Sequence, residues 1–403
     1  MRRTLILSAF CLSVLIPGAV FGQSQPSIKY ETDDVTLTFH GRLQLEGWSS
    51  SCSGFVPGLP ENDPDSACDE GAPPFDIFLR RARTSIEAGL FDFLDVKLQL
   101  DFSGFDDVAI KDGYARLNFF PALKVRFGNM KRPFDGFQLT SSSQMIIIER
   151  DLDIPGVPSL RALSLDELTT RFRASDRDVG IELSGDVAGG RVSYWVGYFG
   201  GQQIQEALDT LPNADSRGQW IGRVQANLEV GKLPLDVAVA GAVTDRPFVT
   251  DDGVTFTGKY FTNLELWLQL GGFNEGPLLQ GEYVYGQNPF ENRQGDILDF
   301  PPTDEFARAQ TFQVNTGWRF LTRPKDYQGS IAKRPIEAIQ PVFRVTWADP
   351  NTDLDRDDNW GITPGVQIFF YGRNKLALNW DVALFSDDTS SASSFKLMLQ
   401  GYF

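Results

Sequence analysis

Three arginines lie within four residues, Arg80, Arg81 and Arg83. A guanidinium group is planar and donates parallel hydrogen bonds, so arginine is well suited to binding carboxylate or phosphate groups, whereas lysine acts as a point charge. Such a cluster either binds anions or forms salt bridges with the carboxylates of nearby loops. If the segment is a strand, Arg81 and Arg83 share one face, and Arg80 points to the other face unless a bulge intervenes.

Residues suited to catalysis are scarce. His40 is the sole histidine, and it falls on the same face of an expected strand as Arg42, Gln44 and Glu46. This polar face favours a role for His40 in lining an interior space or in a subunit contact over a role in catalysis. The hydroxyl cluster Ser141–Ser143 has no nearby base to activate it, so we assign it to loop hydrogen bonding. The sequence contains no phosphate-cradling glycine loop and no metal motif. We therefore expect no enzyme activity, no cofactor and no metal.

The N-terminus has the layout of a secretory signal peptide. Arg2 and Arg3 precede an apolar stretch, and small residues flank Phe21, so we expect residues 1–22 to be removed and Gln23 to begin the mature chain. The formal net charge is −16 for the chain, and −18 once Arg2 and Arg3 are lost. Nucleic acid binding needs a basic patch, so this acidic balance argues against it.

Two cysteines, Cys52 and Cys68, remain after the expected cleavage. An even pair in an exported protein indicates one disulfide, which would close a loop and stabilise the fold by roughly 3 kcal/mol. Metal binding is the alternative, but two cysteines without a nearby histidine make a poor site.

Apolar and polar residues alternate with a period of two along much of the chain, as in 94–102, 259–270 and 375–384. The apolar faces continue for ~9–11 residues, the length that crosses a bilayer when a strand is tilted, and the opposite faces are charged throughout. This favours membrane strands around a wet lumen over a soluble sandwich. Every backbone group in lipid must be paired, so such strands must close into a barrel.

The alternating segments predict an all-β fold, a sixteen-stranded antiparallel transmembrane barrel formed by residues 23–403. The segments are 35–48, 75–89, 93–104, 108–120, 123–130, 178–186, 191–199, 220–229, 234–245, 257–270, 277–287, 306–319, 337–348, 360–371, 375–386 and 394–403. Short connectors alternate with long ones, as expected of periplasmic turns and outer loops. The connector 320–336 is an exception, because it is long yet expected on the periplasmic side. The terminal Phe403 on an alternating strand is similar to the sorting signal of outer-membrane barrels.

Several segments, in order, resemble the phosphate-selective porin O/P family of outer-membrane porins. They are Gly41–Gly47 (GRLQLEG), Leu79–Arg83 (LRRAR), Phe127–Phe134 (FGNMKRPF), Leu139–Ser142 (LTSS) and Ile148–Arg150 (IER). The similarity is strongest over residues 35–182. Residues 127–150 are fairly specific to the family, whereas the rest is shared by barrels generally.

The resemblance implies a homotrimer in outer-membrane lipid, with each barrel narrowed by an inward-folded third loop, here residues 131–177. It also implies that basic side chains guide phosphate or similar small anionic solutes through this constriction. The residues that match the family's basic positions, or lie in its loop segment, are Arg80, Arg81, Arg83, Lys131, Arg132 and Arg150. We expect these to line the pore, and we expect Lys97 and Lys375 to lie on ordinary barrel wall.

Three alternative functions can be compared with an anion-selective pore. Residues 131–177 hold nearly equal numbers of basic and acidic residues, which permits a general or cation-preferring porin. An outer-membrane enzyme would need a nucleophile with a base, or paired carboxylates. An adhesin would need larger outer loops than these.

Overall fold

The computed structural model describes residues 28–53, 75–104, 108–152, 154, 164–172, 174–200, 218–249, 255–292, 306–324, 327, 333–355, 357–386 and 391–403. The expected signal peptide lies outside these residues. The expected disulfide does too, because Cys68 and the side chain of Cys52 are not among them.

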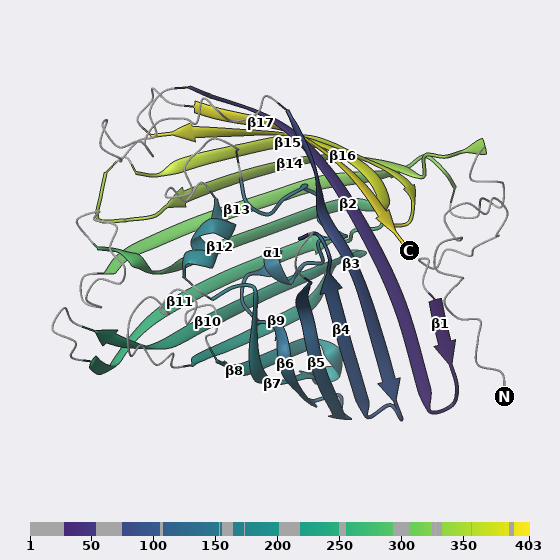
Figure 1. Cartoon of the computed structure of the whole chain (residues 1–403), viewed down its shortest axis with the longest axis horizontal. Coiled ribbons are helices and arrows are strands. Elements are labelled where there is room, and N and C mark those ends of the chain that lie inside the picture. The colour runs from purple at the N-terminus through teal and green to yellow at the C-terminus, as the bar shows by residue number, and fades with distance from the viewer. Residues whose placement is uncertain are drawn as a thin grey trace.

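The described residues form sixteen long antiparallel strands and one short one (Figure 1). The strands are β1 (Ile28–Glu31), β2 (Val35–Ser53), β3 (Asp76–Leu90), β4 (Leu94–Asp101), β5 (Ala109–Phe120), β6 (Leu123–Lys131), β7 (Arg177–Val187), β8 (Val192–Phe199), β9 (Gln219–Val230), β10 (Leu233–Val249), β11 (Thr255–Gly271), β12 (Gly276–Asn292), β13 (Phe306–Leu321), β14 (Ala338–Asp349), β15 (Asn359–Tyr371), β16 (Asn374–Phe385) and β17 (Ser391–Tyr402).

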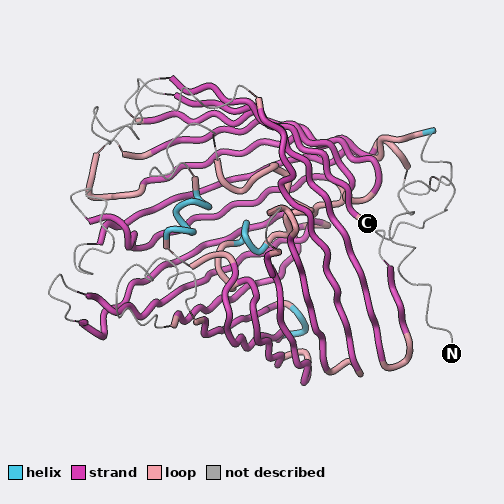
Figure 2. Tube along the Cα trace, viewed as in Figure 1, coloured by secondary structure: helices cyan, strands magenta, loops and turns pink. Residues whose placement is uncertain are grey.

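Strands β2 to β17 close into a barrel. Each pairs with its neighbour in sequence, and β17 pairs with β2 to complete the ring, with Tyr402 opposite Arg42 and Ser391 opposite Ser53. Figure 2 shows these strands tilted and wrapped around one space. The sixteen-stranded antiparallel barrel predicted from alternation is therefore confirmed, with strand ends that differ from the prediction by a few residues.

The two faces of the barrel wall differ as the alternation predicts. On β11, Leu264 and Leu266 are 45% and 46% exposed on the outer surface, whereas Glu265 between them is fully buried on the inner side. A polar inner face beside an apolar outer face is the arrangement of a barrel with lipid outside and water inside.

Strand β1 was not predicted, because four residues are too few to show a period. It pairs with β2 through Ile28 opposite Phe39, beyond the point where β17 ends. There the final residue closes the barrel seam. The backbone N–H of Phe403 donates to the Gly41 carbonyl at 2.9 Å, and the Gly41 N–H donates to the Phe403 carbonyl at 2.5 Å.

The long connector between β13 and β14 is tied together at its two ends. The N–H of Thr322 donates to the carbonyl of Glu337 at 2.9 Å. The carboxylate of Glu337 also accepts from Arg323 at 2.8 Å and from Arg319 at 3.2 Å. These contacts make a hairpin-like neck, so a long connector fits at the end of the barrel that otherwise has short turns.

The connector from β6 to β7 folds into the barrel and includes two short helices, α1 (Gly136–Leu139) and α2 (Leu165–Arg171). Its apolar residues Ile146 and Ile147 are buried against Leu278 and Val342 on the inner wall. This third loop therefore runs inward, as expected. Within the described part of the chain, no helix is long and apolar enough to span a membrane.

Candidate functional site

A β-bulge brings two of the predicted arginines onto the same side of the wall. Along the β2–β3 pairing, Gln44 lies opposite Arg81 but Leu45 lies opposite Leu79, so Arg80 is the extra residue. A bulge re-aims side chains locally and breaks strict alternation. As a result, Arg80 and Arg81 both reach the third loop.

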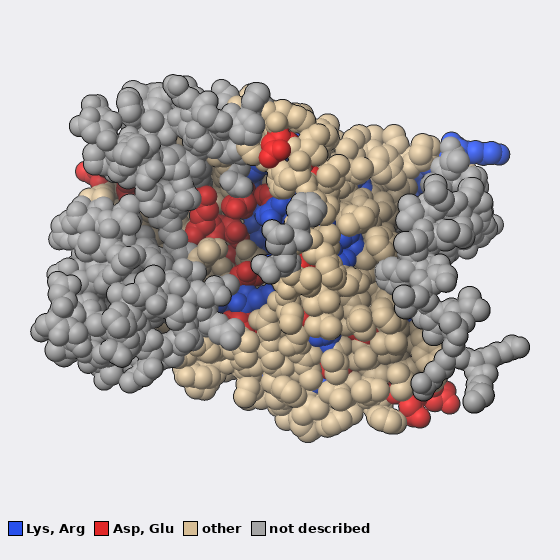
Figure 3. Space-filling model, in the orientation of Figure 1, with Lys and Arg blue, Asp and Glu red and all other residues tan. Residues whose placement is uncertain are grey.

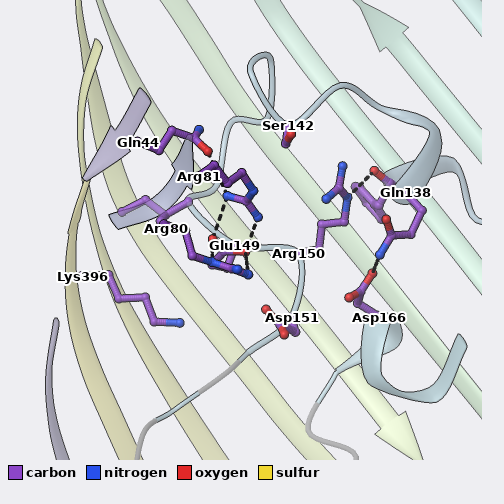
Figure 4. Close-up of polar contacts among 12 residues, drawn as sticks. Gln44, Arg80, Arg81, Gln138, Ser142, Glu149, Arg150, Asp151, Asp166 and Lys396 are labelled. Atoms are coloured by element: carbon purple, nitrogen blue, oxygen red, sulfur yellow. Dashed lines mark hydrogen bonds and ion pairs between the residues drawn. The ribbon is translucent and has the colours of Figure 1, made fainter. Parts of the chain in front are cut away.

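Both arginines bind the carboxylate of Glu149 on that loop (Figure 4). Arg80 donates from Nε to Oε1 at 2.8 Å and from Nη2 to Oε2 at 3.0 Å. Arg81 donates from Nη1 to Oε1 at 3.0 Å and from Nη2 to Oε2 at 2.9 Å. Burial alone would raise the pKa of Glu149, but the charges of Arg81 and Arg80 outweigh it and hold the pKa below its ordinary value.

Arg83, the third member of the cluster, lies further along the same inner face. Its Nε donates to Asp101 Oδ2 at 2.6 Å, on the neighbouring strand β4. The three arginines therefore do not form one free cationic patch. Each has a carboxylate partner, although the side chain of Arg80 remains 39% exposed.

Lys131 and Arg150 brace the third loop from within. The ammonium of Lys131 donates to the carbonyls of Gln138 and Thr140. The guanidinium of Arg150 donates to the carbonyl of Phe137 at 2.9 Å and of Thr140 at 2.7 Å. Both cations thus meet backbone oxygens at the end of α1 and fix the path of the loop, and a pore-lining role for them stays a prediction.

Arg132 does not line the water-filled space, contrary to our expectation. Its side chain is fully buried at the root of the loop, where it donates to the Ser175 carbonyl and, at 3.2 Å, to Gln219 on β9. Asp178 on β7 lies 3.9 Å away. The family pattern placed Arg132 in the right segment, but packing between the loop and the wall decides which side chains reach water.

Residues on strands β14 and β16 of the barrel wall hold the part of the third loop that follows α1. Arg344 on β14 donates to three successive loop carbonyls, those of Glu149 at 3.1 Å, Arg150 at 3.0 Å and Asp151 at 2.9 Å. Lys375 on β16 donates to the Met145 carbonyl at 2.6 Å. Lys375 was expected on ordinary wall, and that expectation was wrong, because its side chain is buried against the loop.

Acidic side chains surround the two loop helices. Asp135 caps α1 by accepting from the Gln138 N–H at 2.9 Å, and Asp166 on α2 accepts from the Gln138 amide at 2.6 Å. On the wall, Glu265 accepts from the Asp135 N–H at 2.7 Å and Glu282 from the Phe137 N–H at 3.2 Å. Burial raises the pKa of both Asp135 and Asp166, and neighbouring carboxylates add to the rise for Asp166.

A cavity of about 270 Å³ lies between the loop's serine run and the inner wall. Its charged lining residues are Arg42, Arg83, Lys97, Arg373 and Glu87. Lys97 was expected on ordinary wall, but it lines this cavity. Figure 3 shows basic and acidic side chains next to each other in the hollow near the middle of the described surface.

Two of these cations have no carboxylate partner in the described part of the chain. Arg42 donates to the Ser142 hydroxyl at 2.9 Å, and Arg373 donates to the Ser143 hydroxyl at 2.9 Å while lying over the Tyr402 ring. Sequence reasoning missed both as site residues. Arg42 shares the inner face of its strand with His40, which was a usable signal. Arg373 stands in a short turn whose place beside the loop only the fold reveals.

A metal centre does not emerge from the residues that the structure describes. No group of three or more His, Cys, Asp or Glu side chains in them is arranged to hold a metal ion.

The comparisons with known proteins agree with this picture. Residues 75–226 match the model of the family described as phosphate-selective porin O and P, the family that the sequence segments resemble. No curated protein matches the chain. The family match and the apolar outer surface of the barrel place the protein in the outer membrane of a Gram-negative bacterium.

Solved outer-membrane proteins share the fold at low sequence identity. The channel DcaP of Acinetobacter baumannii matches with a TM-score of 0.58 and 11% identity, over 93% of this chain and 99% of that one. The outer membrane protein OmpT of Vibrio cholerae, in its trimer form, matches with 0.52 and 12%, over 92% and 100%. OmpF of Salmonella typhi, in complex with daunomycin, matches with 0.52 and 10%, over 93% and 100%.

Proposed function

We propose that this protein, part of which matches the phosphate-selective porin O and P family, is a water-filled pore that prefers small anionic solutes. The family match and the barrel support an outer-membrane porin channel. The preference for anions goes further and rests on the residues of the lumen. Selectivity in a pore depends on the few charges that line its narrow part, so the overall net charge of the chain does not decide it.

The observation that carries the proposal is the excess of positive charge around the 270 Å³ cavity. Four basic residues line it against the single carboxylate of Glu87. Arg42 and Arg373 matter most, because their described side-chain hydrogen-bond partners are neutral serine hydroxyls and neither forms a salt bridge within the described part of the chain. An anion that passes the loop would meet these two guanidinium groups together with hydroxyl donors.

Replacing both arginines should test this directly. We expect Arg42→Gln/Arg373→Gln to lower the anion-over-cation permeability ratio several-fold in planar bilayers. Each charge in a narrow, partly desolvated passage acts on a passing ion by roughly 1–4 kcal/mol, depending on the effective dielectric constant. The measurement is the reversal potential across a potassium chloride gradient.

A matched control removes the same charge elsewhere. Arg191 and Lys232 are exposed in short turns and do not line the cavity, so Arg191→Gln/Lys232→Gln should leave the ratio near that of the unmodified pore. Equal effects of the two double variants would mean that overall charge, and not the cavity, sets the selectivity.

The acidic cluster around α1 favours a cation-preferring pore as the second candidate. Asp135, Asp166, Glu265 and Glu282 lie close together, with Arg223 bound to Glu265. These carboxylates are less able to attract cations than their number implies. Asp135, Glu265 and Glu282 are almost fully buried, and burial raises the pKa of Asp135 and of Asp166, which favours their neutral forms.

We also propose that the pore is a homotrimer. The family resemblance implies it, and one matched structure, OmpT of Vibrio cholerae, is described as a trimer form. Light scattering of the detergent-solubilised protein should give the mass of three chains after correction for bound detergent. The mass of a single chain would contradict the proposal.

We also propose that the chain is exported with removal of its signal peptide and that its two remaining cysteines form a disulfide. Removal of residues 1–22 and a disulfide between Cys52 and Cys68 are both expected from the sequence. Intact-mass measurement of protein taken from the outer membrane tests them together. It should give a chain that begins at Gln23 and lacks two hydrogens relative to its reduced form. A retained leader, or two free thiols, would contradict the corresponding part.

A further inference from the structure

The Arg80–Arg81 pair is a complete carboxylate site whose occupant belongs to the protein itself. We propose that this pair binds the carboxylate group of a permeating solute, and that Glu149 is the tethered occupant which such a solute displaces. The inference rests on the proposed function and deepens it, because it assigns carboxylates as a substrate class and locates where they bind.

The geometry of the pair specifies a carboxylate. Each of the two Glu149 oxygens accepts one hydrogen bond from Arg80 and one from Arg81, over 2.8–3.0 Å. Two forks therefore converge on one planar group with two oxygens, and a carboxylate satisfies all four donors without an oxygen to spare. The β-bulge at Arg80 makes this convergence, since regular alternation would point Arg80 away.

A neighbouring acid disfavours more highly charged anions. Glu46 on β2 is 2% exposed and lies within hydrogen-bonding reach of Glu149, and its Oε2 atom has no hydrogen-bond partner. A phosphate at the site would carry further oxygens and more negative charge toward the buried Glu46 side chain, where the cost of desolvating them opposes its binding. The site thus favours a monovalent carboxylate over phosphate.

The side chain of Glu149 can leave without unfolding the loop. Arg344 holds the carbonyls of Glu149, Arg150 and Asp151, so the backbone there is fixed by contacts that do not involve the carboxylate. Arg80 is the member of the trio that water reaches, with 39% of its side chain exposed against 5% for Arg81 and Glu149. An incoming carboxylate can pair first with Arg80 and then take the place of Glu149 (Figure 4).

Propionate is a suitable probe, because it reproduces the end of a glutamate side chain. In Glu149→Ala, added propionate should block chloride current at a concentration roughly tenfold lower than in the unmodified pore, as expected when charge-assisted hydrogen bonds become free for a solute. The Glu149→Ala substitution should lower the blocking concentration of inorganic phosphate less than that of propionate. In Glu149→Ala/Arg80→Ala the gain in propionate block should disappear.

Glu337→Ala is the matched control. Glu337, in the connector between β13 and β14, also bridges two arginines, Arg319 at the end of β13 and Arg323 in the connector. It should not produce the gain in propionate block. If Glu149→Ala does not insert into bilayers, Glu149→Gln can be measured instead. Its reversal potential should indicate a stronger preference for anions than that of the unmodified pore.

The proposal is overturned if propionate blocks Glu149→Ala no more strongly than it blocks the unmodified pore. It is also overturned if Glu337→Ala increases propionate block as much as Glu149→Ala does, or if Glu149→Ala increases block by phosphate more than block by propionate. These outcomes are separate from the proposed anion preference, which the reversal potential of the unmodified pore tests. A cation-preferring pore whose Glu149→Ala variant still binds propionate would refute that preference and keep the carboxylate site.

Discussion

At the scale of single residues, the arginine cluster that the sequence marks differs from the arginines that carry the proposed anion preference. Arg80 and Arg81 meet at Glu149, and Arg83 meets Asp101, so their charge is matched locally. Arg42 and Arg373, which the sequence analysis missed, line the cavity and donate to serine hydroxyls. Charge clusters are visible in sequence, but their counter-ions come from residues that are distant along the chain, such as Glu149 for Arg80. Sequence analysis therefore identifies candidate anion-binding arginines, but it does not show which of them lack a carboxylate partner.

The buried carboxyl of Asp166 predicts a pH dependence. Burial, Asp135 and Asp151 raise its pKa well above the ordinary value of about 3.9, while Arg150 and Gln138 oppose the rise. A raised native pKa means that the folded state binds the proton more tightly. The stability contributed by the neutral form is therefore complete below pH ~4 and is lost as the pH rises through the native pKa.

Asp166→Asn should remove this loss, since the asparagine carbonyl can still accept from Gln138. We expect the variant to keep its folded gel mobility to a higher temperature than the unmodified protein at pH 8, and to differ little at pH 4. The gain is on the order of 1.4 kcal/mol for each pKa unit of the original shift. Asp34→Asn, in the exposed turn after β1, serves as the control. A gain at pH 4 as large as at pH 8 would rule out this origin.

At the scale of elements, the strands were predictable and their irregularities were not. Alternation is a local property, so all sixteen barrel strands show it in sequence. The bulge at Arg80 arises from a register shift between Gln44 and Leu45 on the partner strand, which a pattern along one strand does not contain. The path of the third loop likewise depends on Arg344 and Lys375, roughly two hundred residues further along the chain.

The barrel seam gives a prediction at this scale. A Cβ atom at Gly41 would lie 2.1 Å from the Phe403 ring, whereas Gly401 has open space around it. Gly41→Val should therefore displace Phe403 and weaken the contact that ends β17, at a cost of about 1–3 kcal/mol as for other overpacked sites. The heat-induced change in gel mobility should occur at a lower temperature for Gly41→Val than for Gly401→Val. The same temperature for both variants would show that Phe403 does not stabilise the seam.

At the scale of the whole molecule, a strongly acidic chain encloses a basic cavity. The formal net charge is −16, yet four basic residues and one acidic residue line the 270 Å³ space beside the third loop. Composition excludes classes of partner, such as nucleic acid, but it does not report which side chains face the lumen. Closing the barrel brings Arg42 from β2 and Arg373 from the turn before β16 to one loop, and this arrangement carries the proposed anion preference.

The reversal potential of the unmodified pore tests the central claim most directly. Purified protein in a planar bilayer would separate concentrated from dilute potassium chloride, a salt whose two ions have nearly equal mobilities. We predict a reversal potential with the sign set by chloride, because the ions pass Arg42 and Arg373. A reversal potential with the sign set by potassium would contradict the account and would leave a cation-preferring porin in its place.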